Sequence, residues 1–166
     1  MISLGIDPGS RRIGYGVIQS DKNTGGGAGI VEFVAAGILK IKSSDDIGAL
    51  VETKRELDAL IKKYKPDAVA VEKLYFAKNQ KTAIAVAQAR GVILLAAHER
   101  AVAITEYTPN EVKLGITGYG FADKKAVLKM VRLFLHKQDL KIIDDASDAL
   151  ALAILASGSN KAQNGY

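Results

Sequence analysis

The sequence of 166 residues contains no cysteine and no tryptophan, and its only histidines are His98 and His136. Without cysteine, the chain forms no disulfide, no thiolate zinc site and no cysteine nucleophile. Two histidines are too few for a histidine-rich metal site and leave little material for a Ser/His/Asp triad. Carboxylates are therefore the first groups to examine for chemistry.

Long apolar runs are also missing. The longest one, residues 91–97, is far shorter than the ~20 residues of a membrane-spanning helix. No basic segment precedes the first apolar run, so we expect no secretory signal and a soluble, cytoplasmic protein. With 23 Lys and Arg against 18 Asp and Glu, the net charge is +5, which suits a polyanionic partner without requiring one.

The hydropathy pattern predicts an α/β fold. Three apolar segments separated by turns, at residues 2–7, 12–19 and 30–41, are typical of an antiparallel meander. Alternating helices and apolar strands follow, which indicates a five-stranded mixed sheet, antiparallel meander plus parallel strands, with helices on both faces. We expect one domain over residues 1–157 and a polar tail at 158–166. The later elements are predicted as helices at 45–64, 81–100, 108 onward, 122–137 and 146–157, and strands at 68–71 and 101–107.

Four carboxylates stand where apolar segments end or a helix begins. Asp7 ends the first strand, Glu72 ends another, and Asp145 and Asp148 share one face at the start of the last helix. Strand ends of an open α/β sheet meet at a ligand-binding crevice. Carboxylates gathered there would repel one another, and a hard divalent cation resolves the repulsion. Two such ions about 4 Å apart favour phosphodiester hydrolysis, whereas glycoside cleavage needs only two carboxyl groups.

Each acid also has a purely structural interpretation. Asp7 precedes Pro8-Gly9, which is ordinary turn chemistry. Asp144 and Asp145 suit the first turn of a helix, where negative charge is favourable, and either one fits the metal-binding role by position. Glu72 is less easily explained, because an acid directly beside a buried apolar strand is unusual.

Several segments resemble RuvC-type Holliday junction resolvases, from residue 1 to about 157. The resemblance lies in LGIDPGSR (4–11), GYGVI (14–18), VE (71–72) followed by AKN (77–79), AQARGV (87–92) and DASDALALA (145–153). Further agreement lies at VK (112–113) and ADK (122–124). It implies a ribonuclease H-like fold and a homodimeric, Mg²⁺-dependent endonuclease of recombination and repair, with Mn²⁺ as a substitute. Such enzymes nick four-way DNA junctions in pairs and work with the RuvA–RuvB branch-migration complex.

The resemblance also implies site residues. It assigns catalysis and metal binding to the four acids already singled out by position, Asp7, Glu72, Asp145 and Asp148. It makes Tyr75 the DNA-facing aromatic and gives functional importance to Lys113 and Lys124.

The basic residues predict a DNA-binding surface, and one helix predicts a dimer. The segment 121–137 carries five basic residues against Asp123, which suits a phosphate track through Lys124 and Lys125. Arg11 and Arg12 flank the first turn, and we take Arg11 as a further phosphate contact. The predicted helix at 82–97 is apolar around nearly its whole circumference, so one face needs cover beyond the sheet. We expect a two-fold dimer through this helix.

Three alternatives fit the sequence less well. A YqgF-type nuclease would share the fold and act on RNA. An actin-like ATPase has a similar Gly-x-Asp-x-Gly loop, but needs roughly twice this chain length. A non-catalytic DNA-structure binder would be expected to lack one of the four acids, and all four are present.

Overall fold

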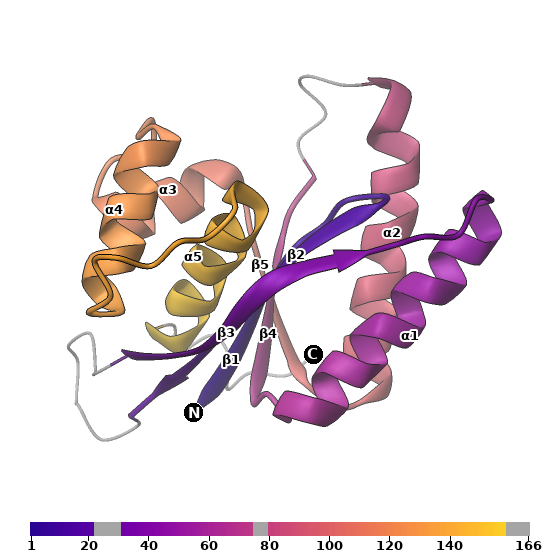
Figure 1. Cartoon of the computed structure of the whole chain (residues 1–166), viewed down its shortest axis with the longest axis horizontal. Coiled ribbons are helices and arrows are strands. Elements are labelled where there is room, and N and C mark those ends of the chain that lie inside the picture. The colour runs from indigo at the N-terminus through magenta and orange to yellow at the C-terminus, as the bar shows by residue number, and fades with distance from the viewer. Residues whose placement is uncertain (22–30, 75–79, 159–166) are drawn as a thin grey trace.

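The computed structural model describes residues 1–21, 31–74 and 80–158, leaving aside the side chains of residues 80 and 81. Three strands come first, and helices and strands alternate after them (Figure 1). The elements are β1 (Ile2–Asp7), β2 (Arg12–Ser20), β3 (Val31–Lys40), α1 (Asp46–Tyr64), β4 (Ala68–Glu72), α2 (Gln80–Glu99), β5 (Ala103–Tyr107), α3 (Pro109–Thr117), α4 (Lys124–Phe134) and α5 (Asp144–Gly158).

The strands form one mixed sheet in the order β3-β2-β1-β4-β5. The first three pair antiparallel, as the meander pattern predicted. The pairs β1–β4 and β4–β5 are parallel. β4 lies inside the sheet, and its residues 68–71 are fully buried, as expected for a strand covered on both faces. The predicted fold class is confirmed.

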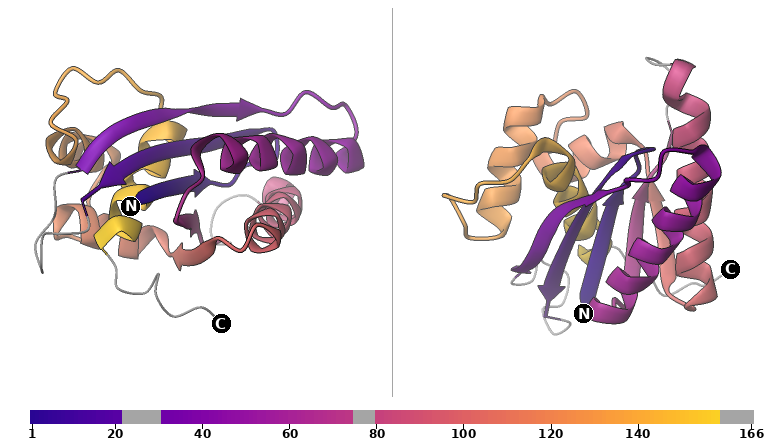
Figure 2. Two further views of the ribbon diagram at one scale, coloured as in Figure 1. Left: turned by 90° about the horizontal axis from the view of Figure 1, so that it is seen from below. Right: turned by 45° about the vertical axis from the view of Figure 1, so that its right-hand side comes forward.

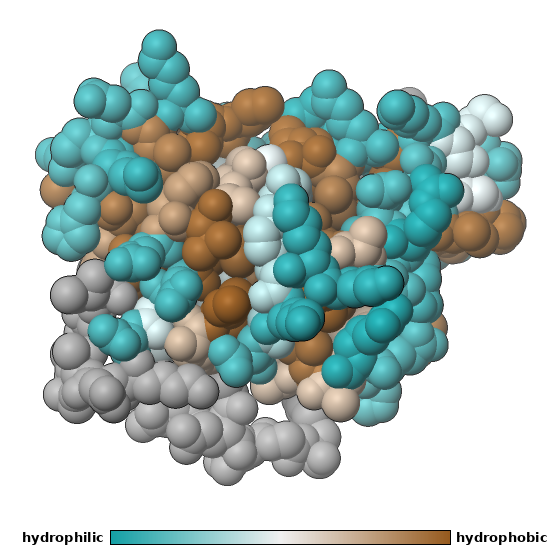
Figure 3. All heavy atoms as spheres, turned by 60° about the horizontal axis from the view of Figure 1, so that its bottom comes forward, coloured by the Kyte–Doolittle hydropathy of each residue, from teal (hydrophilic) through white to brown (hydrophobic). Residues whose placement is uncertain are grey.

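Helices cover both faces of this sheet. Figure 2 shows α1 and α2 on one side and α3, α4 and α5 on the other. Alternate residues of β1 serve the two layers: Leu4 and Ile6 pack into the α1/α2 core, whereas Gly5 faces α5. On the face shown in Figure 3, hydrophilic and hydrophobic residues are interspersed, as on most protein surfaces.

Glycines let α5 approach the sheet closely. A Cβ on Gly5 would lie 1.9 Å from the backbone oxygen of Ala149, and one on Gly14 would lie 2.1 Å from that of Asp145. Gly14 pairs with Asp7 across the β1–β2 ladder. The first turn of α5 therefore packs directly against the strand beside the end of β1, because no side chain separates them.

The starts of α4 and α5 and the end of α4 differ from the predicted ones by two or three residues. α4 begins at Lys124 because Asp123 caps it, accepting a hydrogen bond from the Ala126 backbone N–H at 2.7 Å, and Ala122 before the cap is buried in the core. It ends at Phe134, and His136 takes a left-handed conformation with φ 50°. α5 begins two residues earlier than predicted, so Asp144 and Asp145 lie in its first turn.

Other predictions fall on the margins of the structure. Gly158 is the last residue of α5, and the rest of the predicted polar tail lies outside the described residues. None of the helices in the described part of the chain is long and apolar enough to cross a membrane.

Candidate active site

Strand alternation and register bring the four acids to one edge of the sheet. Asp7 ends β1 and Glu72 ends β4. Ile6 pairs with Val71 in the parallel ladder, so these two acids follow side by side on neighbouring strands. Each lies two residues after a residue that faces α5, namely Gly5 and Ala70, and therefore shares that face. The first two turns of α5 cover this face and carry Asp145 and Asp148 (Figure 1).

Burial and mutual repulsion perturb the acids strongly. Burial raises the pKa of Asp7 from 3.8 to about 8, and the charges of Glu72, Asp148 and Asp145 contribute to the same rise. Burial, followed by the charge of Asp148, raises the pKa of Glu72 from 4.5 to about 7. Burial also raises the pKa of Asp148. Such shifts are typical of functional sites, since a folded protein otherwise avoids uncompensated buried carboxylates.

Two basic side chains reach the acids and partly compensate their charge. The Arg12 guanidinium donates hydrogen bonds from Nε and Nη2 to Asp145 Oδ2, both at 3.3 Å. The Lys124 ammonium donates to Asp148 Oδ2, also at 3.3 Å. Proximity to Asp148 raises the pKa of Lys124, and the charge of Lys124 opposes the upward pKa shift at Asp7. The acid cluster, defined as Asp7, Glu72, Asp145 and Asp148, is thus held with two basic residues at its rim.

The structure distinguishes the two neighbouring acids of α5. The Asp144 side chain is 74% exposed, and its nearest basic partner is Lys124 at 4.0 Å. The Asp145 side chain is 33% exposed, and its charge raises the pKa of Asp7. This geometry favours Asp145 as the member of the cluster.

The donor set fits a hard divalent cation. All four groups are carboxylates, the oxygen ligands that Mg²⁺ prefers, and the raised pKa values of Asp7, Glu72 and Asp148 reflect buried charge that a cation would relieve. Among the described residues, no three acids or histidines yet stand close enough to hold a metal ion. Arg12 and Lys124 each bind one of the carboxylates instead. Both ion pairs are solvent-exposed, so their disruption costs only about 0–1 kcal/mol each.

Of the DNA-binding residues predicted from the sequence, some lie near the acid cluster and others do not. The charges of Lys124 and Lys113 oppose the upward pKa shift of Glu72, so both lysines lie near the acid cluster. Lys125 is exposed beside Lys124. Tyr75 lies outside the described residues.

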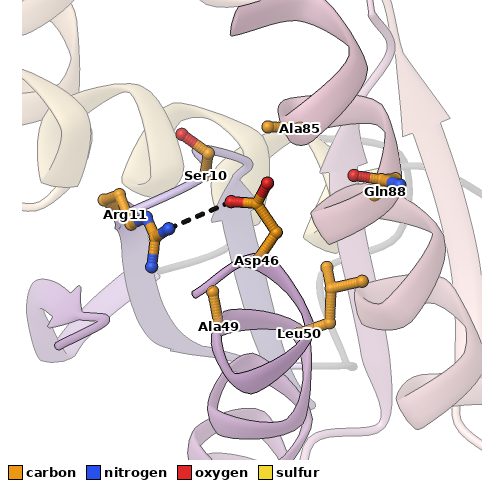
Figure 4. Close-up of a pocket in the computed structure, with 7 residues that line it drawn as sticks. All are labelled: Ser10, Arg11, Asp46, Ala49, Leu50, Ala85 and Gln88. Atoms are coloured by element: carbon orange, nitrogen blue, oxygen red, sulfur yellow. Dashed lines mark hydrogen bonds and ion pairs between the residues drawn. The ribbon is translucent and has the colours of Figure 1, made fainter. Parts of the chain in front are cut away.

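Arg11 is occupied elsewhere. Its guanidinium donates to the Ser43 carbonyl and to Asp46 Oδ1, the latter at 3.1 Å. Figure 4 shows this pair lining a small pocket between the first turn, α1 and α2, with Gln88 on the far side. The pocket does not include the acid cluster, so the DNA contact at Arg11 stays a prediction.

Two arginines at the site were not singled out from the sequence. Arg12 begins β2 on the strand face of Gly14, whereas Arg11 precedes the strand. Arg90 of α2 donates from Nε to the backbone carbonyl of Glu72 at 3.2 Å and pairs with Glu106 of β5. Arg90 thereby fixes the end of β4 from α2, which lies on the other face of the sheet from α5. No local sequence pattern indicates such a contact.

Comparisons with known proteins point to one family. The family model of the crossover junction endodeoxyribonuclease RuvC matches residues 3–156. The RuvC of Fusobacterium nucleatum is 47% identical over 151 residues, covering 91% of this chain and 77% of that protein. A solved structure of Thermus thermophilus RuvC superposes with a TM-score of 0.84 at 30% identity, covering 95% of this chain and 94% of the other. The structure of T. thermophilus RuvC in complex with a Holliday junction substrate gives 0.81 at 26% identity, with the same coverage.

The match includes part or all of every element from β1 to α5. The predicted resemblance is therefore confirmed. The chain belongs to the RuvC family of crossover junction endodeoxyribonucleases.

Proposed function

We propose that this chain resolves four-way DNA junctions by phosphodiester hydrolysis at the acid cluster, with divalent cations held by Asp7, Glu72, Asp145 and Asp148. Membership of a family of crossover junction endodeoxyribonucleases supports the reaction and the substrate. The observation that carries the residue assignment is the convergence of four carboxylates, three of them with raised pKa values, on one face of the sheet.

The roles follow from the surroundings of each residue. Asp7 and Glu72 are backed by the sheet and serve as the fixed ligands, whereas Asp145 and Asp148 become available when their ion pairs with Arg12 and Lys124 open. A bound divalent cation would neutralise the scissile phosphate and activate the attacking water. Mg²⁺ is the ion we propose, because an all-carboxylate set with water suits it, and Mn²⁺ accepts the same ligands.

The same ion pairs suggest how substrate enters. Lys124 and Lys113 lie at the acid cluster, where a DNA phosphate must arrive next to two or more carboxylates. Once a cation neutralises Asp148, the Lys124 ammonium is free to pair with that phosphate. Lys124 then serves as a phosphate-binding residue and positions the scissile group, and Lys125 extends the contact along the strand.

A dimer through α2 supplies the second active site that paired nicking requires. The exposed residues of α2 recur along one side of the helix, and they include two large apolar side chains, Ile84 at 72% exposed and Leu95 at 50%. Between them lie Gln88 and Gly91, and a Cβ added at Gly91 would meet nothing within 4 Å. An exposed stripe that carries two large apolar side chains, with a small residue between them, suits a second copy of itself. A four-way junction presents two equivalent strands to two equivalent sites.

The decisive experiment compares three labelled substrates in Mg²⁺: a four-way junction, a linear duplex of the same sequence, and an RNA–DNA hybrid. We expect symmetric nicks in the junction alone. Cleavage of the hybrid instead would favour the YqgF-type alternative, and junction binding without nicks would favour a DNA-structure binder.

The matched pair of variants is Asp7→Asn, which removes a cluster acid, and Asp139→Asn, which changes an exposed acid between α4 and α5. Cleavage that survives Asp7→Asn would overturn the residue assignment.

Cooperation with a RuvA–RuvB branch-migration complex is part of the same proposal. It rests on the family resemblance alone. Addition of purified RuvA and RuvB to the junction assay is the test, and an unchanged nicking rate would contradict it.

A further inference from the structure

The loop between α3 and α4 exposes two aromatic rings. Tyr119 is 62% exposed and Phe121 is 77% exposed, one on each side of Gly120. Their ring centroids lie 5.8 Å apart, with the ring planes inclined by 59°. Phe121 is the most exposed large apolar side chain of the described residues. Aromatic surface left in water contributes nothing to the stability of the monomer, which indicates a partner.

The backbone under the two rings is firmly held. Thr117 Oγ1 accepts a hydrogen bond from the Tyr119 N–H at 3.1 Å and lies 2.8 Å from the Lys113 carbonyl. Gly118 ends α3 with φ 77°, a left-handed conformation that favours glycine. The Ala122 N–H donates to the Tyr119 carbonyl at 3.1 Å, and the Ala122 side chain is buried. The rings are therefore presented by an ordered loop, so binding of a ligand costs little backbone entropy.

Lysines at both ends of this loop place it at the acid cluster. Lys124 follows Phe121 by three residues, and its ammonium lies 3.3 Å from Asp148 Oδ2. Lys113 precedes the loop on α3 and lies near enough to Glu72 for its charge to oppose the upward pKa shift of that carboxyl. The aromatic rings are thus flanked by the two basic residues that reach the site of cleavage.

Exposed rings flanked by lysines fit a DNA strand better than a protein partner. A protein surface would have to desolvate the lysine charges, whereas the phosphates of a strand pair with them and its bases stack on the rings. Bases inside a duplex have both faces covered by their neighbours. At the centre of the junction the stack is interrupted, so a base there, once unpaired, offers a free face.

We propose that Tyr119 and Phe121 form a stacking platform for one unpaired base of the junction, next to the phosphate that is cut. The proposal rests on the proposed function and names a substrate contact within it. Because the two ring planes are inclined by 59°, a base stacks on one ring and meets the edge of the other. Stacking accepts any base, so the platform contributes affinity and position without sequence preference.

The test uses the full chain and a four-way junction that carries 2-aminopurine at each central position in turn, without divalent metal. The double variant Tyr119→Leu with Phe121→Leu keeps apolar side chains but removes stacking. The pair Tyr119→Phe with Phe121→Tyr keeps both rings. Leu133→Ala, at a 41%-exposed residue near the end of α4, is the control for loss of exposed apolar surface.

We expect the leucine variant to bind the junction at least about fivefold more weakly, the lower end of the effect of losing one stacked base. At one central position its complex should fluoresce more strongly than the wild-type complex, because the base no longer rests on a ring. The slope of log affinity against log salt should stay the same, since the variant keeps every basic residue that pairs with a phosphate. The ring-swapped variant and Leu133→Ala should behave as the wild type.

Junction affinity within twofold of the wild type, with unchanged fluorescence at every position, would overturn the platform. A change of oligomeric state with unchanged DNA binding would also overturn it and would assign the rings to a protein interface. Wild-type nicking of the junction separates this failure from failure of the proposed function. If the wild type cuts the junction and the leucine variant binds as well, only the platform is wrong; if the wild type does not bind the junction, both are wrong.

Discussion

Replacing Asp7 by asparagine should make the metal-free protein more stable while abolishing its activity. The folded-state pKa of Asp7, about 8, lies above its unfolded value of 3.8. Between these two values the folded state holds a proton that the unfolded state has released. The free energy of unfolding therefore falls as pH rises through this window, and the favourable contribution present at low pH is lost above pH 8.

The size of the effect follows from the shift. At about 1.4 kcal/mol for each pKa unit, the full displacement from 3.8 to about 8 corresponds to an upper limit of about 6 kcal/mol. A charged carboxylate draws in water, which reduces the cost of its burial, so we expect a net gain of about 2–3 kcal/mol at pH 8.5. For a chain of this length, that raises Tm by roughly 5–10 °C.

Thermal unfolding followed by circular dichroism between pH 5 and pH 9 in EDTA measures this directly. The difference in Tm between Asp7→Asn and the wild type should widen with pH and level off above pH 8. The exposed control Asp139→Asn should show no comparable trend. Addition of Mg²⁺ at pH 8.5 should raise the Tm of the wild type and leave that of Asp7→Asn nearly unchanged, because a ligand stabilises only the state that binds it. A Tm difference that does not depend on pH would refute the account of Asp7 as a buried, repelled carboxylate.

Four further outcomes are expected. Lys124→Ala should reduce nicking and lower the salt slope of junction binding by about 0.9, because one phosphate fewer is neutralised, and an unchanged slope would exclude Lys124 as a phosphate-binding residue. Gly14→Ala should lower both stability, by about 1–3 kcal/mol, and nicking, because its Cβ would lie 2.1 Å from the Asp145 backbone oxygen; Gly158→Ala, at the end of α5 with open space around its Cβ, is the control in unfolding experiments. Leu95→Asp should convert a dimer into monomers in light scattering, and a persistent dimer would place the interface elsewhere. The nicking rate should rise between pH 6 and pH 9 as Asp7 and Glu72 ionise, and more Mg²⁺ should move the midpoint to lower pH; a flat profile would contradict their role as ligands.

The order of elements and the four acids were predictable because their signals are local. A strand repeats every two residues and a helix every 3.6, so apolar periodicity locates both within a few residues. The positions of Asp7 at a strand end and of Asp145 and Asp148 three residues apart in a helix follow from the same periods. Their number and type then indicate a metal-dependent hydrolysis. The resemblance to one family added the substrate.

Contacts between distant parts of the chain were not predictable in this way. Arg11 and Arg12 are neighbours with the same chemistry, yet one binds Asp46 and the other binds Asp145, which is 133 residues away. The choice depends on the position of Arg12 in β2, on the face that packs against α5, whereas Arg11 precedes the strand, and on how closely the glycines let α5 approach. The same packing of α5 against the sheet leaves the Asp144 side chain exposed and half-buries that of Asp145.

The sequence by itself determined which elements form and which carboxylates are available, because hydropathy periods and capping act over a few residues. Only the tertiary structure decided which basic residues meet those carboxylates, how far burial shifts their pKa values, and that Tyr119 and Phe121 remain exposed beside Lys124. The physical reason is that charge interactions and burial depend on distances through space, which strand register and helix packing set after the local elements have formed.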